Sequence, residues 1–240
     1  MRILRSTIAQ IVMLVTLIIV SIICYIASYI VSKERTTWLL CKTFGFVRNI
    51  TALIMGIKIT YKGMENIPEG AVIFASKHES AFETAFLFNE FKMNSTYALK
   101  IEIKKVPLWG RLAMCNDGIF IHRGNASTFR NFIKDVQKTL DSGKSFSIFP
   151  EGTRVLPNQR PKFKSGIAKI YSSTTAPIIP VALNTGDCFP KGCKVLRKAH
   201  IIVEFLPPIY REMNEQEFTE FLHKQINDKS EELHKLSFKK

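Results

Sequence analysis

A histidine and a glutamate five residues apart are the first pair in this sequence whose chemistry can be read from residue type and spacing. His78 follows the apolar run Ala71 to Phe74, which reads as a strand, and Glu83 stands at the head of a predicted helix. A neutral imidazole can act as a general base, and a carboxylate bonded to its other ring nitrogen can orient it. Ligands of open α/β sheets bind beyond the carboxyl ends of the strands. A histidine placed there can therefore meet a substrate.

The same stretch also has a purely structural interpretation. Ser80 and Glu83 have the spacing of a capping box, in which the glutamate reaches back to the backbone of the first turn. Residues five apart on a continuous helix differ by about 140° in direction. His78 and Glu83 can therefore cooperate only if His78 precedes the helix and the turn folds back. A carboxylate on the far ring nitrogen would support the pair, and a side chain curled onto its own helix amides would support the cap.

Cationic and flexible residues follow three further predicted strands. Arg123 and Arg154 could each place a guanidinium fork on phosphate oxygens, and Lys100 could add a point charge. Gly152 would let the backbone approach a ligand closely. Taken singly, each arginine could equally be a surface residue. Because the carboxyl ends of parallel strands meet at one sheet edge, the set as a whole predicts a base, an orienter and an anion clamp.

The elements that must position these residues alternate along the chain. Apolar runs predict strands over 57–61, 71–75, 96–100, 118–122, 145–149, 178–183 and 200–206. Helical periodicity is found after His78 to about Phe91, and over 127–140, 163–171 and 214–236. Alternation of this kind predicts an α/β fold whose mixed, largely parallel sheet is covered by helices on both sides.

The composition limits the classes of molecule that this protein is expected to bind. The 240 residues include 34 Lys and Arg against 20 Asp and Glu, a formal charge of +14. Such a field attracts nucleic acid, anionic lipid headgroups or phosphorylated small molecules. A nucleic-acid partner is not expected, because the sequence has an apolar leader and contains no recognised nucleic-acid-binding signature. The five cysteines are scattered and odd in number, which favours a reducing compartment. No metal site is predicted.

The first 56 residues predict a membrane anchor. No charged residue occurs from Ile8 to Val31, and as a helix this run would extend roughly 36 Å, enough to cross a bilayer core of about 30 Å. The segment from Trp38 to Ile59 is apolar but interrupted by Lys42 and Arg48, which suits a helix in the interface. Capping of the globular core is the alternative for that second helix. Residues 57–240 then form the catalytic domain, and whether the leader spans the bilayer or lies in one leaflet stays open.

Four motifs give the sequence a family resemblance. It resembles the glycerolipid acyltransferases, and among them the bacterial 1-acyl-sn-glycerol-3-phosphate acyltransferases, over most of residues 55–205. The pattern N-H-x-x-x-x-D is matched by residues 77–83, with glutamate in place of aspartate. A lysine-rich run with P-x-x-G, followed by a glycine and then I-x-R, is matched at 100–110 and 118–123, with His122 where an aspartate commonly stands. F-P-E-G-T-R occurs unbroken at 149–154, and a V-P-V-type strand at 179–182.

The resemblance implies a glycerol-3-phosphate acyltransferase-like fold and transfer of a fatty acyl group from acyl carrier protein or coenzyme A to the sn-2 hydroxyl of lysophosphatidic acid. It makes His78 the base and Glu83 its orienter, with no covalent intermediate and no cofactor. The residues that it implies for holding glycerol phosphate are Arg123, Glu151, Gly152, Thr153, Arg154 and, more weakly, Lys100.

The setting that follows is the cytoplasmic face of the inner membrane, among anionic headgroups and lysophosphatidic acid. Two rival functions remain. One is the same chemistry on glycerol 3-phosphate or another lysophospholipid, and the other is a non-catalytic module that binds anionic lipid.

Overall fold

A seven-stranded sheet forms the centre of the protein in the computed structural model, which describes residues 2–83, 95–121, 126–192 and 195–238. The strand order is β1-β7-β6-β2-β5-β3-β4, and of the described pairs only β6 and β7 run antiparallel. The prediction of a mixed, largely parallel sheet is confirmed. The strands are β1 (Lys58–Lys62), β2 (Ile73–Ser76), β3 (Ser95–Lys100), β4 (Ile119–Ile121), β5 (Ser145–Ile148), β6 (Ile178–Leu183) and β7 (His200–Phe205).

The helices agree with the predicted segments, with small differences at their ends. They are α1 (Arg2–Ile30), α2 (Lys33–Met55), α3 (Trp109–Cys115), α4 (Ala126–Asp141), α5 (Gly166–Ser173) and α6 (Glu215–Leu236), and the 3-10 turns are η1 (Met64–Asn66), η4 (Ile101–Lys105) and η5 (Thr185–Asp187). Helix α5 begins three residues later than the periodicity predicts, because the Lys164 amide donates to the Pro150 carbonyl at 2.9 Å. The helix after His78 begins at Ala81, and its predicted continuation from 84 to 91 lies outside the described residues.

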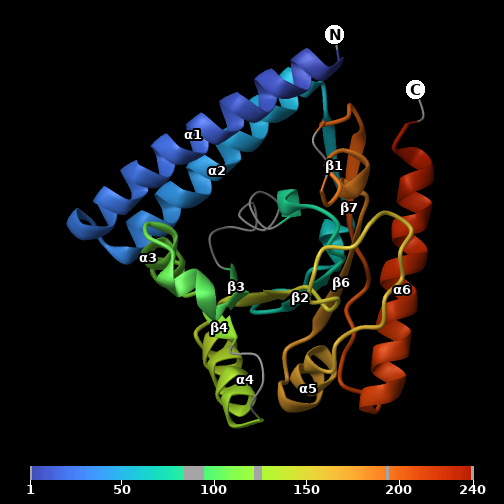
Figure 1. Ribbon diagram of the computed structural model, residues 1–240. Coiled ribbons are helices and arrows are strands. Elements are labelled where there is room, and N and C mark those ends of the chain that lie inside the picture. Colours follow the sequence, from blue (N-terminus) through green and yellow to red (C-terminus); the bar gives the residue numbers. More distant parts are fainter. Residues whose placement is uncertain (1, 84–94, 122–125, 193–194, 239–240) are drawn as a thin grey trace.

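Side chains alternate between the two faces of the sheet, and helices cover both faces. Phe74 and Ile179 point to the face that also buries Val47 and Met55 of α2. Their neighbours Ile73 and Ile178 belong to the opposite face, in a core cluster formed with α4, α5 and α6. Figure 1 shows this layering, with the α1-α2 hairpin on one side of the sheet and α6 on the other. Each fully buried aliphatic or aromatic side chain contributes about 1.5–3 kcal/mol.

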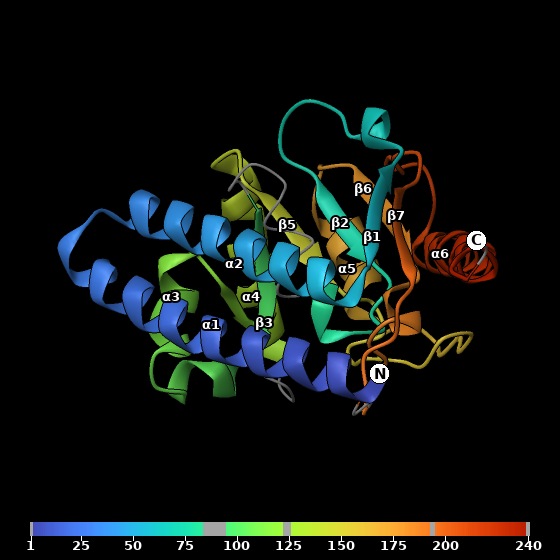
Figure 2. The same ribbon diagram turned by 90° about the horizontal axis from the view of Figure 1, so that it is seen from above.

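The α1-α2 hairpin lies across the sheet as a long antiparallel pair, which Figure 2 shows from above. Ser32 caps the start of α2, and Gly56 ends it in the left-handed conformation at φ 66°. The domain holds α1 near both ends. At one end the Leu196 amide donates to Ser6 Oγ at 2.7 Å, and at the other Arg111 donates to Ser28 Oγ at 2.6 Å.

Most of the outward surface of α1 is apolar. Its exposed large hydrophobic residues are Ile3, Leu4, Ile8, Ile11, Leu14, Val15, Ile18, Ile19, Ile22, Ile23, Ile26, Tyr29 and Ile30. Both hairpin helices are long and apolar enough to cross a membrane by length and composition. The second helix also buries residues on the sheet, so its amphipathic pattern serves the core as well as an outer surface.

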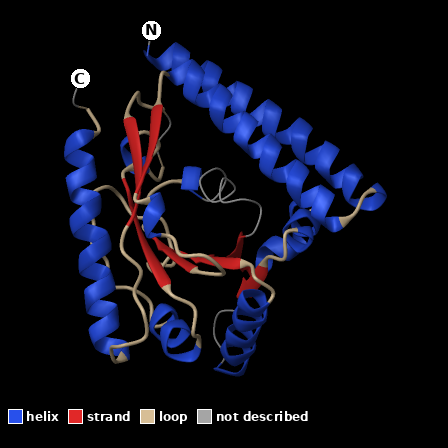
Figure 3. Cartoon of the chain, turned by 180° about the vertical axis from the view of Figure 1, so that it is seen from behind, coloured by secondary structure: helices blue, strands red, loops and turns tan. Residues whose placement is uncertain are grey.

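The order of the strands determines which loops can meet. Strand β2 lies between β5 and β6 and runs parallel to both. The segments that leave the carboxyl ends of these three strands therefore share one edge of the sheet, seen from behind in Figure 3. Those segments begin at Lys77, Phe149 and Asn184.

Candidate active site

His78 lies in the loop between β2 and the following helix, and it is hydrogen-bonded to Glu83. Nδ1 of the imidazole lies 2.9 Å from Oε2 of Glu83. Because a carboxylate only accepts hydrogen bonds, Nδ1 carries the hydrogen and Nε2 is left with its lone pair. The Glu83 side chain is fully buried, whereas that of His78 is 15% exposed. His78 precedes the helix, as the predicted pairing requires.

Glu83 also caps its own helix. The Ser80 amide donates to both carboxylate oxygens at 2.9 Å, and the Glu79 amide donates to Oε1 at 3.3 Å. The Ser80 hydroxyl completes the cap by accepting from the Phe82 amide at 3.0 Å. One carboxylate therefore makes the hydrogen bonds that the orienting interpretation requires and those that the capping interpretation requires. Its fixed place in the first turn also fixes the direction of the imidazole.

The segment after β5 encloses His78. The Phe149 ring stacks on the imidazole, with centroids 3.9 Å apart and planes 17° from parallel. The Val155 amide donates to the His78 carbonyl at 2.8 Å. Nε2 of His78 has no hydrogen-bond partner within the described part of the chain. The histidine is thus held through Nδ1, its ring face and its backbone, while the basic nitrogen remains available.

Opposing effects act on the charge of Glu83. Burial raises the pKa of Glu83, and the hydrogen bonds from His78 and Thr185 oppose that increase. The Thr185 hydroxyl, which lies just beyond β6, donates to Oε1. Donors from two separate segments, residues 78–80 and Thr185, therefore surround this carboxylate and stabilise its ionised form. An ionised Glu83 can in turn stabilise an imidazolium on His78.

A second buried pair lies beneath the histidine. Lys77 is 2% exposed, and its Nζ lies 3.6 Å from Glu151 Oε1 while donating to the Gln159 carbonyl and to Asn227 Oδ1, each at 2.7 Å. Burial raises the pKa of Glu151 to about 7, although the Lys77 ammonium and the nearby amides of Glu151 and His78 act to lower it. Neither carboxylate oxygen of Glu151 has a hydrogen-bond partner of standard geometry among the described residues.

The predicted anion-binding residues occupy the same edge of the sheet where they are described. Gly152 has φ 68° in a tight turn, in which its amide donates to the Phe149 carbonyl at 2.9 Å. Gly152 and Thr153 are exposed and Arg154 is half-buried. No described carboxylate forms an ion pair with Arg154. The Val155 contact holds this turn against the backbone of His78.

The remaining two predicted cationic residues are Lys100 and Arg123. Lys100 is exposed at the carboxyl end of β3, where it pairs in register with Ile121 of β4. Arg123 lies outside the described residues, as does His122. The structure therefore groups His78, Glu83 and the turn 151–154.

Several polar residues around this group were not predicted from the sequence. Thr185 is more than 100 positions from Glu83, and His234 and Asn227 belong to the C-terminal helix. One signal was present. The polar run from Asn184 to Asp187 directly follows the fully buried strand β6, which marks it as a strand-end segment at the same edge. The helix α6 shows no comparable signal, since its histidines look like part of a charged surface.

Comparison with known proteins places this arrangement in a family. The sequence pattern of the acyltransferase family matches residues 58–184, just over half of the chain. A 1-acyl-sn-glycerol-3-phosphate acyltransferase of Pseudomonas aeruginosa is 32% identical over 169 residues, covering 70% of this chain and 65% of that protein. The protein of the same name from Borreliella burgdorferi is 28% identical over 190 residues, covering 76% of this chain and 75% of its own.

Other relatives match over a smaller part of their length. A probable 1-acyl-sn-glycerol-3-phosphate acyltransferase of Mycoplasma pneumoniae is 29% identical over 153 residues, covering 62% of this chain and 57% of that protein. The aligned segment thus spans less than two thirds of the Pseudomonas and Mycoplasma proteins. Among solved structures, the 1-acyl-sn-glycerophosphate (LPA) acyltransferase PlsC from Thermotoga maritima has the same fold, with a TM-score of 0.80, 20% identity and full coverage of both chains. The resemblance predicted from the four motifs is confirmed, and this chain belongs to the acyltransferase family.

Proposed function

We propose that this protein transfers a fatty acyl group from an acyl thioester to the sn-2 hydroxyl of 1-acylglycerol 3-phosphate, which yields phosphatidic acid. The observation that carries the proposal is the 2.9 Å hydrogen bond from His78 Nδ1 to Glu83, which leaves Nε2 unpaired within the described residues. The names of the relatives from Pseudomonas aeruginosa and Borreliella burgdorferi support this acceptor.

In the proposed reaction the substrate supplies the nucleophile. Nε2 of His78 takes the proton of the acceptor hydroxyl as its oxygen attacks the thioester carbonyl. Glu83 stabilises the imidazolium that forms, and that proton then passes to the thiolate as the tetrahedral intermediate collapses. The products are an ester and a free thiol, with no acyl group attached to the enzyme. The Phe149 ring shields one face of the imidazole from water.

The glycerol phosphate would bind at the turn after β5. Arg154 is the best-placed described cation, because the next residue, Val155, is bonded to the backbone of His78. Gly152 would let the backbone approach the phosphate, and Thr153 is exposed on the same turn. Arg123 and Lys100 would complete the cationic group. Glu151 is only 2% exposed and lies beside Lys77, so we assign it support of the turn.

The proposed setting is one leaflet of a membrane. Ser6 and Ser28 are roughly 33 Å apart along α1, at 1.5 Å per residue, and both are bonded to the same folded domain. A helix held in this way cannot cross a bilayer while the domain stays on one side. We therefore infer that the hairpin lies in the membrane plane with its apolar surface in the lipid, which would keep the lysolipid near His78.

The cytoplasmic face of the inner membrane is the matching location. Acyl carrier protein and coenzyme A thioesters, the two candidate donors, are cytosolic, and the +14 charge would attract anionic headgroups or an acidic carrier.

An acceptor panel tests the proposal. Purified protein in vesicles is given a labelled acyl thioester with 1-acylglycerol 3-phosphate, glycerol 3-phosphate or a lysophospholipid whose phosphate is esterified. We expect 1-acylglycerol 3-phosphate to give the highest kcat/KM by at least tenfold. Arg154→Ala should raise KM for that acceptor more than it lowers kcat, because Arg154 binds a group remote from the reacting atoms. Preference for an acceptor without a phosphate monoester would overturn the assignment.

A further inference from the structure

The short turn η5 bonds through consecutive residues to segment 77–83, which carries His78 and is called the catalytic loop below. Thr185 donates its hydroxyl to Glu83 Oε1, and the Gly186 amide donates to Glu79 Oε2 at 3.0 Å. A Cβ on Gly186 would lie 2.9 Å from Glu79 Oε2 and from Pro157 Cγ. Only glycine lets the turn approach this closely. The third residue, Asp187, accepts from His234 Nδ1 at 2.8 Å.

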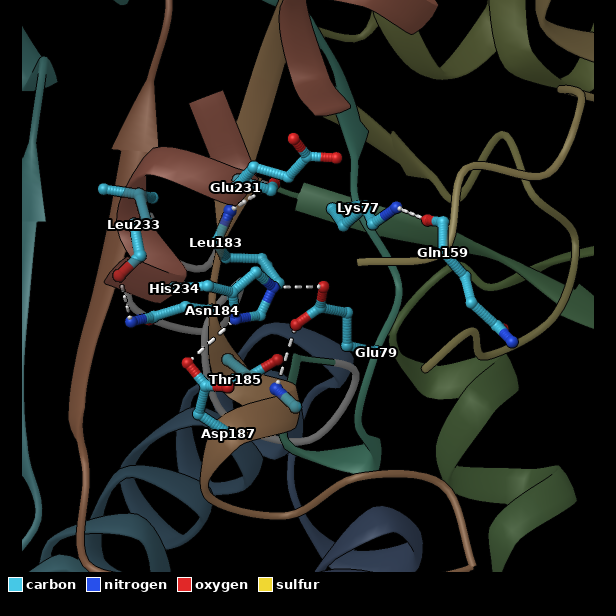
Figure 4. A network of polar contacts seen from close by, with 12 residues as sticks. Lys77, Glu79, Gln159, Leu183, Asn184, Thr185, Asp187, Glu231, Leu233 and His234 are labelled. Atoms are coloured by element: carbon cyan, nitrogen blue, oxygen red, sulfur yellow. Dashed lines mark hydrogen bonds and ion pairs between the residues drawn. The ribbon is translucent and has the colours of Figure 1, made fainter. Parts of the chain in front are cut away.

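His234 joins this turn to the catalytic loop a second time. Its Nε2 lies 2.9 Å from Glu79 Oε1, so the ring bridges Glu79 and Asp187, as Figure 4 shows. The side chain is 8% exposed. Since both partners are carboxylates that only accept, both ring nitrogens must donate, and the ring is an imidazolium. One cation thereby holds two acidic residues of different segments against each other.

The helix that carries His234 contacts the loop at another point. Asn227 lies two turns earlier on the same face of α6 and accepts from Lys77 Nζ at 2.7 Å. Lys77 and Glu79 flank His78 in the sequence. The C-terminal helix therefore holds both neighbours of the proposed base, although none of the described contacts of α6 reaches His78 itself.

We propose that His234 is a positioning residue for acyl transfer: by holding Glu79 and Asp187 together it places the Thr185 hydroxyl on Glu83, and through Glu83 it fixes the tautomer of His78. This inference rests on the proposed function, because it assumes that His78 Nε2 is the base. The path consists of the Asp187 and Glu79 contacts, the Thr185 hydrogen bond and the imidazole hydrogen bond. A purely structural role for His234 would stabilise the fold without changing how Glu83 meets His78.

Thr185 tests the last step of the path with a matched pair of variants. Thr185→Val keeps the shape but removes the hydroxyl, and Thr185→Ser keeps the hydroxyl. A hydrogen bond to a buried carboxylate corresponds to about 10–100-fold in rate. We expect Thr185→Val to lower kcat by that factor with KM nearly unchanged, and Thr185→Ser to recover most of it. Equal kcat for Thr185→Val and wild type would overturn the proposal.

His234→Gln tests the cation, with His223→Gln as its control. His223 lies on the same helix but is half-buried, with its ring against Phe163 and away from Glu79 and Asp187. If His234 acts through Thr185, His234→Gln should lower kcat about tenfold or more, and the double variant with Thr185→Val should be no slower than the slower single variant. His223→Gln should match wild type. A His234→Gln rate equal to that of His223→Gln, or effects that multiply in the double variant, would contradict the path.

A spectroscopic measurement separates this inference from the proposed function. The five histidines are labelled with ¹⁵N, and that of residue 78 is assigned by comparison with a His78→Gln spectrum. We expect His78 to be the Nδ1-protonated tautomer in wild type and a mixture of tautomers in Thr185→Val and His234→Gln. This readout needs no turnover. A wild type inactive on every acceptor would refute the reaction, whereas unchanged His78 signals in both variants would refute the positioning path.

Discussion

Replacing Glu83 with glutamine should remove most of the catalysis, because the orientation of the new amide determines which nitrogen of His78 carries the hydrogen. In wild type, Oε1 accepts from the Glu79 amide, the Ser80 amide and the Thr185 hydroxyl, whereas Oε2 accepts from His78 Nδ1 and the Ser80 amide. An NH₂ group in place of Oε1 would oppose three donors. The amide should therefore place its NH₂ toward His78 and donate to Nδ1. The imidazole hydrogen would then move to Nε2, the atom that must accept the substrate proton.

The size of the effect follows from losing a correctly protonated base. General-base catalysis contributes about 10²–10⁴-fold, or roughly 3–5 kcal/mol of barrier, and we expect Glu83→Gln to lower kcat within that range. Release of free thiol from an acyl thioester measures the rate, and thermal unfolding of the same sample checks the fold. Glu83→Asp is the comparison variant. Its side chain is one methylene shorter, so its carboxylate would lie about 1.5 Å farther from His78 Nδ1, which is 2.9 Å from Glu83 Oε2 in wild type. A folded Glu83→Gln protein with wild-type kcat would show that Glu83 only caps the helix.

Three further predictions concern the groups around this pair. Lys77→Met should lower the free energy of unfolding by about 3–5 kcal/mol, because it leaves the carboxylate of Glu151 buried without its cation; a Lys77→Met/Glu151→Gln double variant should recover part of this in the same denaturant titration, and no recovery would contradict the pairing. Burial lowers the pKa of His234, but hydrogen bonds to its two carboxylate partners outweigh this and raise it to about 9. Because the pKa is raised in the folded state, the charged ring contributes at most about 3 kcal/mol to the free energy of unfolding. This contribution is complete below the ordinary pKa of about 6.5 and is lost as pH rises through 9. The unfolding midpoints of wild type and His234→Gln should therefore converge above pH 9, and a constant difference would count against the charged ring. Gly186→Ala should destabilise the protein by about 1–3 kcal/mol, since its Cβ would lie 2.9 Å from Glu79 Oε2, and an unchanged melting temperature would contradict the close approach.

Much of the fold could be predicted because its elements obey local rules. The strand predicted at 178–183 matches β6, and the helix predicted at 127–140 is extended by one residue at each end in α4. These segments bury one continuous apolar run or one helical stripe, so periodicity alone identifies them. Helix α5 begins late because a tertiary hydrogen bond to Pro150 keeps Lys164 out of the helix. Periodicity contains no information about such a contact.

The same distinction between local pattern and tertiary contact applies to the candidate site. His78 and the turn at 151–154 could be predicted because each follows a strand, and Glu83 because it stands at the start of the next helix, five residues after His78. The roles of Thr185 and His234 could not, since they depend on which strands are neighbours in the sheet and on where α6 packs. The spacing of the residues also could not decide whether Glu83 caps the helix or orients His78. Only the coordinates show that one carboxylate has enough acceptor positions for both.

The charge on the protein shows a similar limit. The excess of lysine and arginine indicates an anionic partner, yet composition does not say which cations are available to it. Lys77 and Arg48 are buried, and each bonds to neighbouring groups of the fold. Arg154 has no described carboxylate partner. In the proposed function, binding of a phosphate therefore depends on a few cations at one sheet edge rather than on the total charge.

The turnover number of His78→Ala with 1-acylglycerol 3-phosphate tests the central claim most directly. Wild type and variant are compared at saturating acyl thioester in vesicles to which both bind equally. The account predicts that kcat falls by about 10²–10⁴-fold while vesicle binding is unchanged, because His78 supplies the base and not the membrane contact. Equal turnover by the two proteins, or no turnover by either with vesicle binding intact, would contradict it and leave a lipid-binding protein instead.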